Sequence, residues 1–191
     1  MIDTLDTVCD YIRYAVSEFR KNKLYYGHGT SSAYDEAVSL VLQTLNLPVT
    51  QLDPYLNAKL LLEEKSLILE RIRIRADKRL PLPYITKKAY LRGYEFYVDE
   101  RVIIPRSYIA EIIQNNQLSP WIDHNELVHN ALDLCTGNGS LSIFLADNFL
   151  DANVVASDIS VEALAVAAVN LKNYNYDQVI QLEQSDLFSG L

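Results

Sequence analysis

Residues 129–149 read HNALDLCTGNGSLSIFLADNF, and this stretch decides the fold. An apolar segment runs into Asp133, two close glycines follow at 137 and 139, and the next apolar residues have helical spacing. A strand, a glycine turn and a helix in this order are typical of a βαβ unit whose turn approaches a nucleotide-like ligand. The stretch therefore predicts a parallel sheet with a ligand-binding loop after its first strand.

The residues after 149 continue this alternation. NVVASD at 153–158 has the pattern of a strand, SVEALAVAAVNLKNY at 160–174 that of a helix, and QVIQLEQ at 178–184 that of another strand. Strands that alternate with helices indicate a parallel α/β architecture with right-handed crossovers. Only three strands fit between 129 and 191, so we expect the first half of a sheet, with an unpaired edge and an uncovered apolar face.

The first 80 residues have helical periodicity and no convincing strand pattern. The stripe of the first helix consists of Val8, Ile12, Ala15, Val16 and Phe19. YYGHGTSS at 25–32 ends that helix, and Ser31 or Ser32 is a candidate N-cap of a second helix that ends before Pro48. A third helical stretch is predicted from about Pro54 to Arg79. We expect residues 1–80 to form a helical domain.

A short aromatic segment separates the helical region from the region of alternating strands and helices. Tyrosine, phenylalanine, valine and isoleucine surround Gly93, which predicts a β-hairpin linker within residues 81–105. Ser107 is the candidate N-cap of a helix over 107–117 that begins the next part. The expected organisation is therefore a helical domain, a hairpin linker, and an incomplete α/β domain over 106–191.

Composition narrows the classes of function. The chain has 191 residues and a formal net charge of −8, which disfavours a protein that coats nucleic acid. Its two cysteines, Cys9 and Cys135, are far apart, so a disulfide framework or a zinc module is not expected and a reducing cytoplasm fits best. His124 and His129 do not form a paired-ligand pattern, and no apolar run has the length of a membrane span. We expect no metal site and no membrane association.

Three acids follow three successive predicted strands at the same sheet edge. Asp158 is placed to accept hydrogen bonds from ribose hydroxyls, and Asp186 to accept from an adenine amine beside an apolar wall at Leu187. Asp133 is poorly placed for a pyrophosphate but suits a ligand with a sulfonium and an ammonium group. Ser142 replaces the third glycine of a dinucleotide motif. These residues favour S-adenosylmethionine over NAD, and an NAD-dependent oxidoreductase is the enzyme alternative.

DLCTGNGS, ASDIS and QSDLF resemble the first three cofactor motifs of class I S-adenosylmethionine-dependent methyltransferases. PLPYITKKAYLRGYEFYVDERVIIPRSYIAEII at 81–113 resembles the linker and entry helix of the glutamine-amide methyltransferases that modify translation proteins. YYGHGTSSAYDEA at 25–37 and IPRSYIAEII at 104–113 are similar to the branch that acts on the third protein of the large ribosomal subunit. The release-factor branch is the alternative.

The resemblance implies a substrate-recognition role for the helical domain, and a Rossmann-like class I sheet of which this chain holds the first half. It implies methyl transfer from S-adenosylmethionine to a glutamine side-chain amide nitrogen of a large-subunit ribosomal protein in the cytoplasm, without a metal. Pro105 and Arg106 would belong to an element that closes over the cofactor. Asp158 would bind the ribose, and Asp186 with Leu187 would frame the adenine. The loop under the methionine end would consist of Cys135, Thr136, Gly137, Asn138 and Gly139, with Asp133 nearby.

Members of the family bind the substrate amide through an Asn-Pro-Pro-Tyr loop after the fourth strand. Here the prolines stand at 48, 54, 81, 83, 105 and 120, and no two are adjacent. We therefore expect an N-terminal fragment that is catalytically inactive, with the catalytic motif beyond Leu191. A non-catalytic, ribosome-associated binding module is the alternative from another class.

RIRIRADKR at 71–79 concentrates cations on an otherwise acidic chain. One interpretation is a weak contact with ribosomal RNA through Arg71, Arg73 and Arg75. The preferred interpretation is a solvated helix end whose cations complement the helix dipole.

Overall fold

The structure, a computed structural model, describes residues 4–190. The chain divides between Thr86 and Lys87 into two compact units, and we call their described residues the helical unit (4–86) and the sheet unit (87–190). This boundary lies six residues beyond the expected end of the helical domain, because Leu82 is buried in the first hydrophobic core. The predicted linker hairpin belongs to the sheet unit. Residues 1–3 and Leu191, at the outer ends of the predicted domains, lie outside the described residues.

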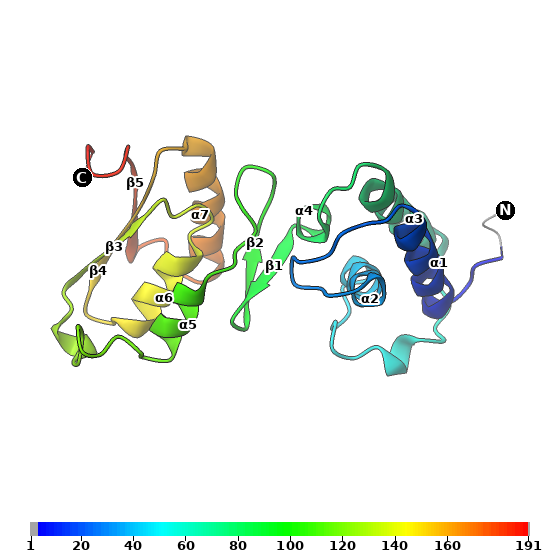
Figure 1. Cartoon of the computed structure of the whole chain (residues 1–191), viewed down its shortest axis with the longest axis horizontal. Coiled ribbons are helices and arrows are strands. Elements are labelled where there is room, and N and C mark those ends of the chain that lie inside the picture. The colour runs from blue at the N-terminus through cyan, green and yellow to red at the C-terminus, as the bar shows by residue number, and fades with distance from the viewer. Residues whose placement is uncertain (1–3, 191) are drawn as a thin grey trace. The chain divides into compact units, whose positions relative to one another are not determined.

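The helical unit contains four α-helices and one 3₁₀ turn among its described residues (Figure 1). They are α1 Val8–Lys21, α2 Ala33–Thr44, η1 Asp53–Tyr55, α3 Leu62–Asp77 and α4 Leu82–Thr86. The predicted stripe of α1 is buried apart from Val16, which packs against the core from a half-buried position. Ser32 is the N-cap of α2, since its hydroxyl accepts a hydrogen bond from the Asp35 amide at 3.1 Å.

The third helix begins eight residues later than expected. Only Asp53–Tyr55 forms a turn near Pro54, and the residues that follow pair with the start of α1 instead. The Leu60 amide donates to the Asp6 carbonyl at 3.0 Å, and the Val8 amide donates to the Ala58 carbonyl at 3.1 Å. These bonds replace the helical ones, so the segment stays extended until Leu62.

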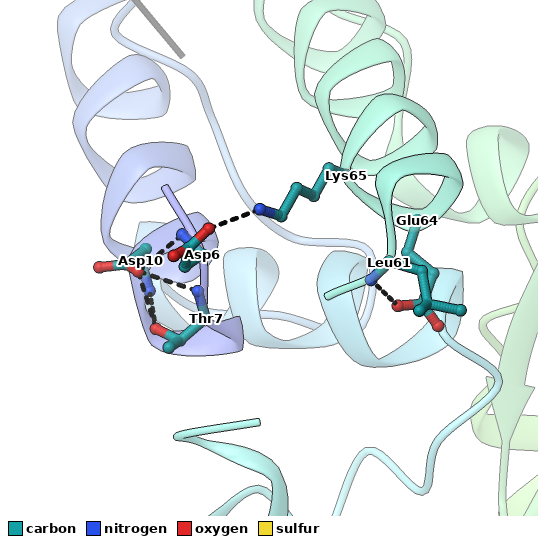
Figure 2. A network of polar contacts seen from close by, with 6 residues as sticks. All are labelled: Asp6, Thr7, Asp10, Leu61, Glu64 and Lys65. Atoms are coloured by element: carbon teal, nitrogen blue, oxygen red, sulfur yellow. Dashed lines mark hydrogen bonds and ion pairs between the residues drawn. The ribbon is translucent and has the colours of Figure 1, made fainter. Parts of the chain in front are cut away.

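Caps and an ion pair fix the beginnings of α1 and α3 (Figure 2). Thr7 and Asp10 form a capping box, in which the Thr7 amide donates to Asp10 Oδ2 at 2.9 Å and the Asp10 amide donates to Thr7 Oγ1 at 3.2 Å. Glu64 Oε2 accepts from the Leu61 amide at 2.8 Å. Lys65 Nζ lies 2.6 Å from Asp6 Oδ1, which connects the two helix starts.

A buried ion pair connects α2 to α3. Arg75 Nε lies 2.5 Å from Glu36 Oε1, and both side chains are at least 95% buried. Arg75 Nη2 also donates to the Tyr25 carbonyl at 2.9 Å, while Glu36 Oε2 accepts from the Thr30 hydroxyl at 3.0 Å. The pair therefore holds both ends of the 25–30 loop against the helices.

This arrangement corrects the interpretation of the basic cluster. Arg75 is buried, and Arg71 is half-buried with Nη1 donating to the Thr44 hydroxyl at 3.0 Å. Neither arginine belongs to a solvated helix end, and of the three proposed RNA contacts only Arg73 is exposed. Burial lowers the pKa of the Arg71 guanidinium.

The sheet unit contains an antiparallel hairpin and a parallel sheet. The hairpin consists of β1 Lys88–Leu91 and β2 Tyr94–Tyr97, and its two-residue turn has positive φ at Arg92 and Gly93, as a type I′ turn requires. The remaining elements are α5 Tyr108–Gln114, η2 Asn125–Leu127, β3 Asn130–Leu134, α6 Ser140–Asn148, β4 Asn153–Asp158, α7 Val161–Asn173 and β5 Ile180–Gln184. The predicted alternation from residue 129 onward is confirmed.

The three parallel strands have the order β3–β4–β5, with α5, α6 and α7 on one side of the sheet (Figure 1). Ile143, Phe144, Ala156 and Leu171 are buried in the core that the helices and the sheet share. Leu132 and Val155 are register partners on neighbouring strands, and Leu132 is 42% exposed. The fold class is thus α/β: a helical N-terminal unit followed by a three-stranded parallel sheet.

No helix within residues 4–190 is both long and apolar enough to cross a membrane.

Candidate functional site

The carboxyl ends of the three strands carry the predicted site residues. Asp133 lies near the end of β3, Asp158 ends β4, and Asp186 follows β5 by two residues. Because the strands are parallel and in register, these ends form one edge of the sheet. The three acids differ in exposure: Asp133 is buried, Asp158 is half-buried and Asp186 is exposed.

The glycine loop, residues 135–139, crosses this edge between β3 and α6. Cys135, Gly137 and Gly139 all have positive φ, and the Thr136 amide donates to the Ser157 carbonyl of β4 at 2.9 Å. A Cβ on Gly139 would lie 3.2 Å from the Cβ of Ala167, so a side chain there would force α7 to shift by a few tenths of an ångström. A Cβ on Gly137 would meet nothing within 4 Å. The loop is therefore tightly packed at Gly139 and open beside the Cα of Gly137, where a ligand has room to approach.

Asp133 holds the glycine loop through hydrogen bonds of its side chain. Its Oδ2 accepts from the Thr136 hydroxyl at 2.6 Å and from the Ser142 hydroxyl at 2.7 Å, and the side chain is almost completely buried. Charge-assisted bonds of this kind are about twice as strong as neutral ones. In the sequence, Ser142 is recognisable only as a departure from a dinucleotide motif. Its hydroxyl in the first turn of α6 is a partner of Asp133.

Asp158 connects the loop to α7. Its Oδ2 accepts from the Gly137 amide at 2.9 Å, and its Oδ1 accepts from the Ser160 amide at 3.0 Å. A carboxylate can accept about four hydrogen bonds, so each oxygen retains capacity for a further donor. That capacity matches a ligand with two neighbouring hydroxyl groups, such as a ribose.

Asp186 and Leu187 lie in a turn that a buried serine organises. Ser185 Oγ donates to the Leu187 carbonyl at 2.7 Å and accepts from the Gly190 amide at 2.9 Å. Leu187 has a φ of 51° and is 55% exposed. The turn presents a carboxylate and an apolar side chain together at the sheet edge. Ser185 was missed in the sequence, where it reads only as the residue between a strand and Asp186.

Asn138 provides a test of whether a ligand fits the loop. Its side chain is almost completely buried, its Oδ1 accepts from the Ser140 amide at 3.3 Å, and its Nδ2 has no hydrogen-bond partner among residues 4–190. Buried polar atoms are rarely left unpaired, and an unpaired donor at a loop suggests that a ligand supplies the acceptor. Together with the open backbone at Gly137 and the acids, this donor fits a cofactor with a polar amino-acid end.

Other candidate residues lie in different surroundings. Pro105 is buried and Arg106 is exposed, and both follow the hairpin by several residues. Nearby, Asp99 accepts two bonds from the Arg101 guanidinium, which holds the pKa of that carboxyl well below its usual range. Within residues 4–190 no group of three acid, histidine or cysteine side chains is arranged to hold a metal ion.

Comparisons with known proteins confirm the predicted resemblance. The family described as "Methyltransferase small domain" matches residues 117–191. The ribosomal protein uL3 glutamine methyltransferase of Neisseria gonorrhoeae is 51% identical over 187 residues, which are 98% of this chain and 62% of that protein. Enzymes of the same name from Burkholderia pseudomallei and Francisella tularensis are 48% and 47% identical over 97% and 100% of this chain, and over 60% of their own length. The chain thus spans about 60% of the length of these curated relatives.

Proposed function

We propose that this chain is the substrate-recognition and cofactor-binding part of a methyltransferase that modifies ribosomal protein uL3. The proposed reaction moves a methyl group from S-adenosylmethionine to the side-chain amide nitrogen of a glutamine. The observation that carries the proposal is the 51% identity to a uL3 glutamine methyltransferase over 187 residues, which include both structural units. Because the proposed substrate is a ribosomal protein, the proposed place of action is the cytoplasm.

The residues at the sheet edge have distinct proposed roles. S-adenosylmethionine supplies an electrophilic methyl group on a positively charged sulfur. Asp158 would accept from the ribose hydroxyls, and Asp186 would accept from the adenine amine beside the apolar side chain of Leu187. Asn138 would donate from Nδ2 to an acceptor at the methionine end. The rest of the glycine loop would contact the methionine end through the backbone of Cys135, Thr136, Gly137 and Gly139.

Charge separates this cofactor from NAD. Asp133 is buried directly below the glycine loop, where a fixed negative charge stabilises a cationic ligand and repels a pyrophosphate. Ser142, which stands where a dinucleotide motif has glycine, donates to the same carboxylate. The loop is thus built around an acid, and this favours S-adenosylmethionine over a dinucleotide.

Methyl transfer to an amide makes demands that this chain does not meet. The lone pair of an amide nitrogen is delocalised into its carbonyl, so an enzyme must orient the nitrogen and hold the amide by hydrogen bonds. The glutamine methyltransferases use an Asn-Pro-Pro-Tyr sequence for this purpose, and the 191 residues contain no adjacent prolines. We therefore expect these residues to bind the cofactor without transferring its methyl group.

The helical unit is the proposed contact with the substrate. The identity to the uL3 glutamine methyltransferases extends through this unit, and this supports its role in substrate contact. The net charge of −8 lies within residues 87–191, so electrostatic attraction of a basic ribosomal protein would act mainly on the sheet unit. Contact with ribosomal RNA is a weaker proposal, because Arg75 is neutralised by Glu36 and Arg71 is half-buried. Only Arg73 of the proposed trio could reach a phosphate. With one phosphate contact, the logarithm of the RNA-binding constant would fall with the logarithm of the salt concentration with a slope of only about one.

Calorimetry with S-adenosylhomocysteine and with NADH tests the proposal on the chain as it exists. We expect S-adenosylhomocysteine to bind and NADH not to bind. Binding of NADH alone would favour the oxidoreductase, and binding of neither would favour a non-catalytic module. In a second experiment, radiolabelled S-adenosylmethionine and uL3 are incubated with the chain; methyl transfer would contradict the expected inactivity.

A further inference from the structure

Asn170, in the third turn of α7, is a buried polar residue that has no role in the proposed cofactor site. Its side chain is completely buried and takes part in three hydrogen bonds. Oδ1 accepts from the Tyr97 amide at 2.7 Å, and Nδ2 donates to the Tyr97 carbonyl at 3.0 Å. Nδ2 also donates to the Asn138 carbonyl at 2.8 Å. One side chain therefore connects the linker hairpin to the glycine loop.

The chemistry of these bonds requires an amide at this position. The two carbonyl oxygens consume both Nδ2 hydrogens, and the amide of Tyr97 needs the side-chain oxygen. Toward Tyr97, the side chain of Asn170 acts as a neighbouring strand would, because it pairs with both backbone groups of that residue. Tyr174 does the same for Glu95, since its hydroxyl lies 2.9 Å from both the amide and the carbonyl.

The same helix face fixes the loop at a second point. Ala167 lies one turn before Asn170 and occupies the space that a side chain on Gly139 would need. The loop residues 138 and 139 thus rest on α7 through one hydrogen bond and one close packing contact. The Asn138 side chain, with its unpaired Nδ2, belongs to the residue whose carbonyl Asn170 holds.

We propose that Asn170 is a positioning residue that couples the docking of the β1–β2 hairpin to the conformation of the glycine loop, and thereby to cofactor affinity. The last step depends on the proposed function, because it requires that the cofactor bind at this loop. If the hairpin and the loop share one partner, a ligand that fixes the loop also stabilises the hairpin, and the coupling is reciprocal. A purely structural asparagine would contribute to stability without this link.

Asn170→Asp is the sharpest perturbation, because it keeps the shape of the side chain and removes both donors. The carboxylate would face two carbonyl oxygens in a buried site. Asn173→Asp is the matched control, since Asn173 is an exposed asparagine on the same helix. Asn170→Ala is the second variant; it removes the three bonds without burying a charge, and serves if the aspartate does not fold.

Hydrogen exchange on the ligand-free chain tests the coupling by itself. The amides of Gly137 and Gly139 donate to Asp158 and Thr136 and do not contact Asn170. We expect them to exchange about 5- to 150-fold faster in both Asn170 variants, the range that corresponds to one lost buried hydrogen bond. Asn173→Asp should exchange like the wild-type chain. Faster exchange at Tyr97 alone would overturn the proposal.

Titration with S-adenosylhomocysteine tests the link to the cofactor. In the wild-type chain, binding should slow exchange at the Tyr97 amide, and the Asn170 variants should lose this protection and bind about tenfold or more weakly. Equal affinity in Asn170→Ala and in the wild-type chain would overturn the link. If the wild-type chain does not bind the ligand, the proposed function fails, while the ligand-free exchange still decides whether Asn170 couples hairpin and loop.

Discussion

Gly139→Ala tests whether α7 sets the shape of the cofactor loop. Gly139 has a φ of 79°, and an added Cβ would lie 3.2 Å from the Cβ and 3.3 Å from the Cα of Ala167. The left-handed conformation costs an alanine about 1–2 kcal/mol. Overpacking against a helix backbone adds about 1–3 kcal/mol, since Cα cannot move without the helix.

The expected loss is therefore about 2–5 kcal/mol of unfolding free energy. For a unit of this size, 1 kcal/mol corresponds to a shift of about 4 °C in Tm, so the melting temperature should fall by about 8–20 °C. Gly137→Ala is the matched control, because Gly137 has a φ of 59° and an added Cβ would meet nothing within 4 Å. Its cost should be limited to the backbone term of about 1–2 kcal/mol.

Thermal unfolding followed by near-ultraviolet circular dichroism separates the two variants. The double variant Gly139→Ala/Ala167→Gly should be less destabilised than the sum of its single variants, because removal of the Ala167 methyl group relieves one of the two contacts. If Gly139→Ala proves no more damaging than Gly137→Ala, the packing argument is wrong. In that case the contact with Ala167 does not determine the conformation of the loop.

Three further outcomes are expected. Glu36→Gln should lower the unfolding free energy in urea by about 3–5 kcal/mol, because it leaves a buried arginine charge uncompensated; a loss below 1 kcal/mol would contradict this. The hydrogen bond to Asp147 and burial raise the pKa of Tyr94 to about 12, so the associated stability is present below pH 10 and lost as pH rises through 12; because Tyr176 also donates to Asp147, absorbance titration should show a lower pKa for two tyrosines in Asp147→Asn. Asp158→Asn should weaken S-adenosylhomocysteine binding about tenfold or more by calorimetry, while the exposed Asp151→Asn should not.

The sheet and the loop could be predicted because their signals are local. Each parallel strand has an acid within two residues of its end, the glycines stand where positive φ is required, and the helical spacing begins directly afterwards. The hairpin was equally accessible, since Arg92 and Gly93 form a two-residue turn between aromatic strands. In each case the deciding residues lie within about ten positions of one another.

The buried polar partners could not be predicted in the same way. Asn170 binds Tyr97, which is 73 positions away, and an asparagine on a helix gives no indication of such a partner. Arg75 could have been identified, because Ile68, Ile72 and Arg75 follow i, i+4, i+7 spacing and therefore share the buried face of α3. The many cations at 71–79 favoured an exposed helix end and drew attention away from this apolar spacing.

The shared carboxylate beneath the loop also limits protein engineering. A designer who wanted a dinucleotide at this site would begin by restoring the missing glycine with Ser142→Gly. That change would remove one of the two hydroxyls that donate to the buried Asp133 and leave its charge partly uncompensated. A change of cofactor preference therefore requires Asp133, Thr136 and Ser142 to be replaced together, as a single unit of design.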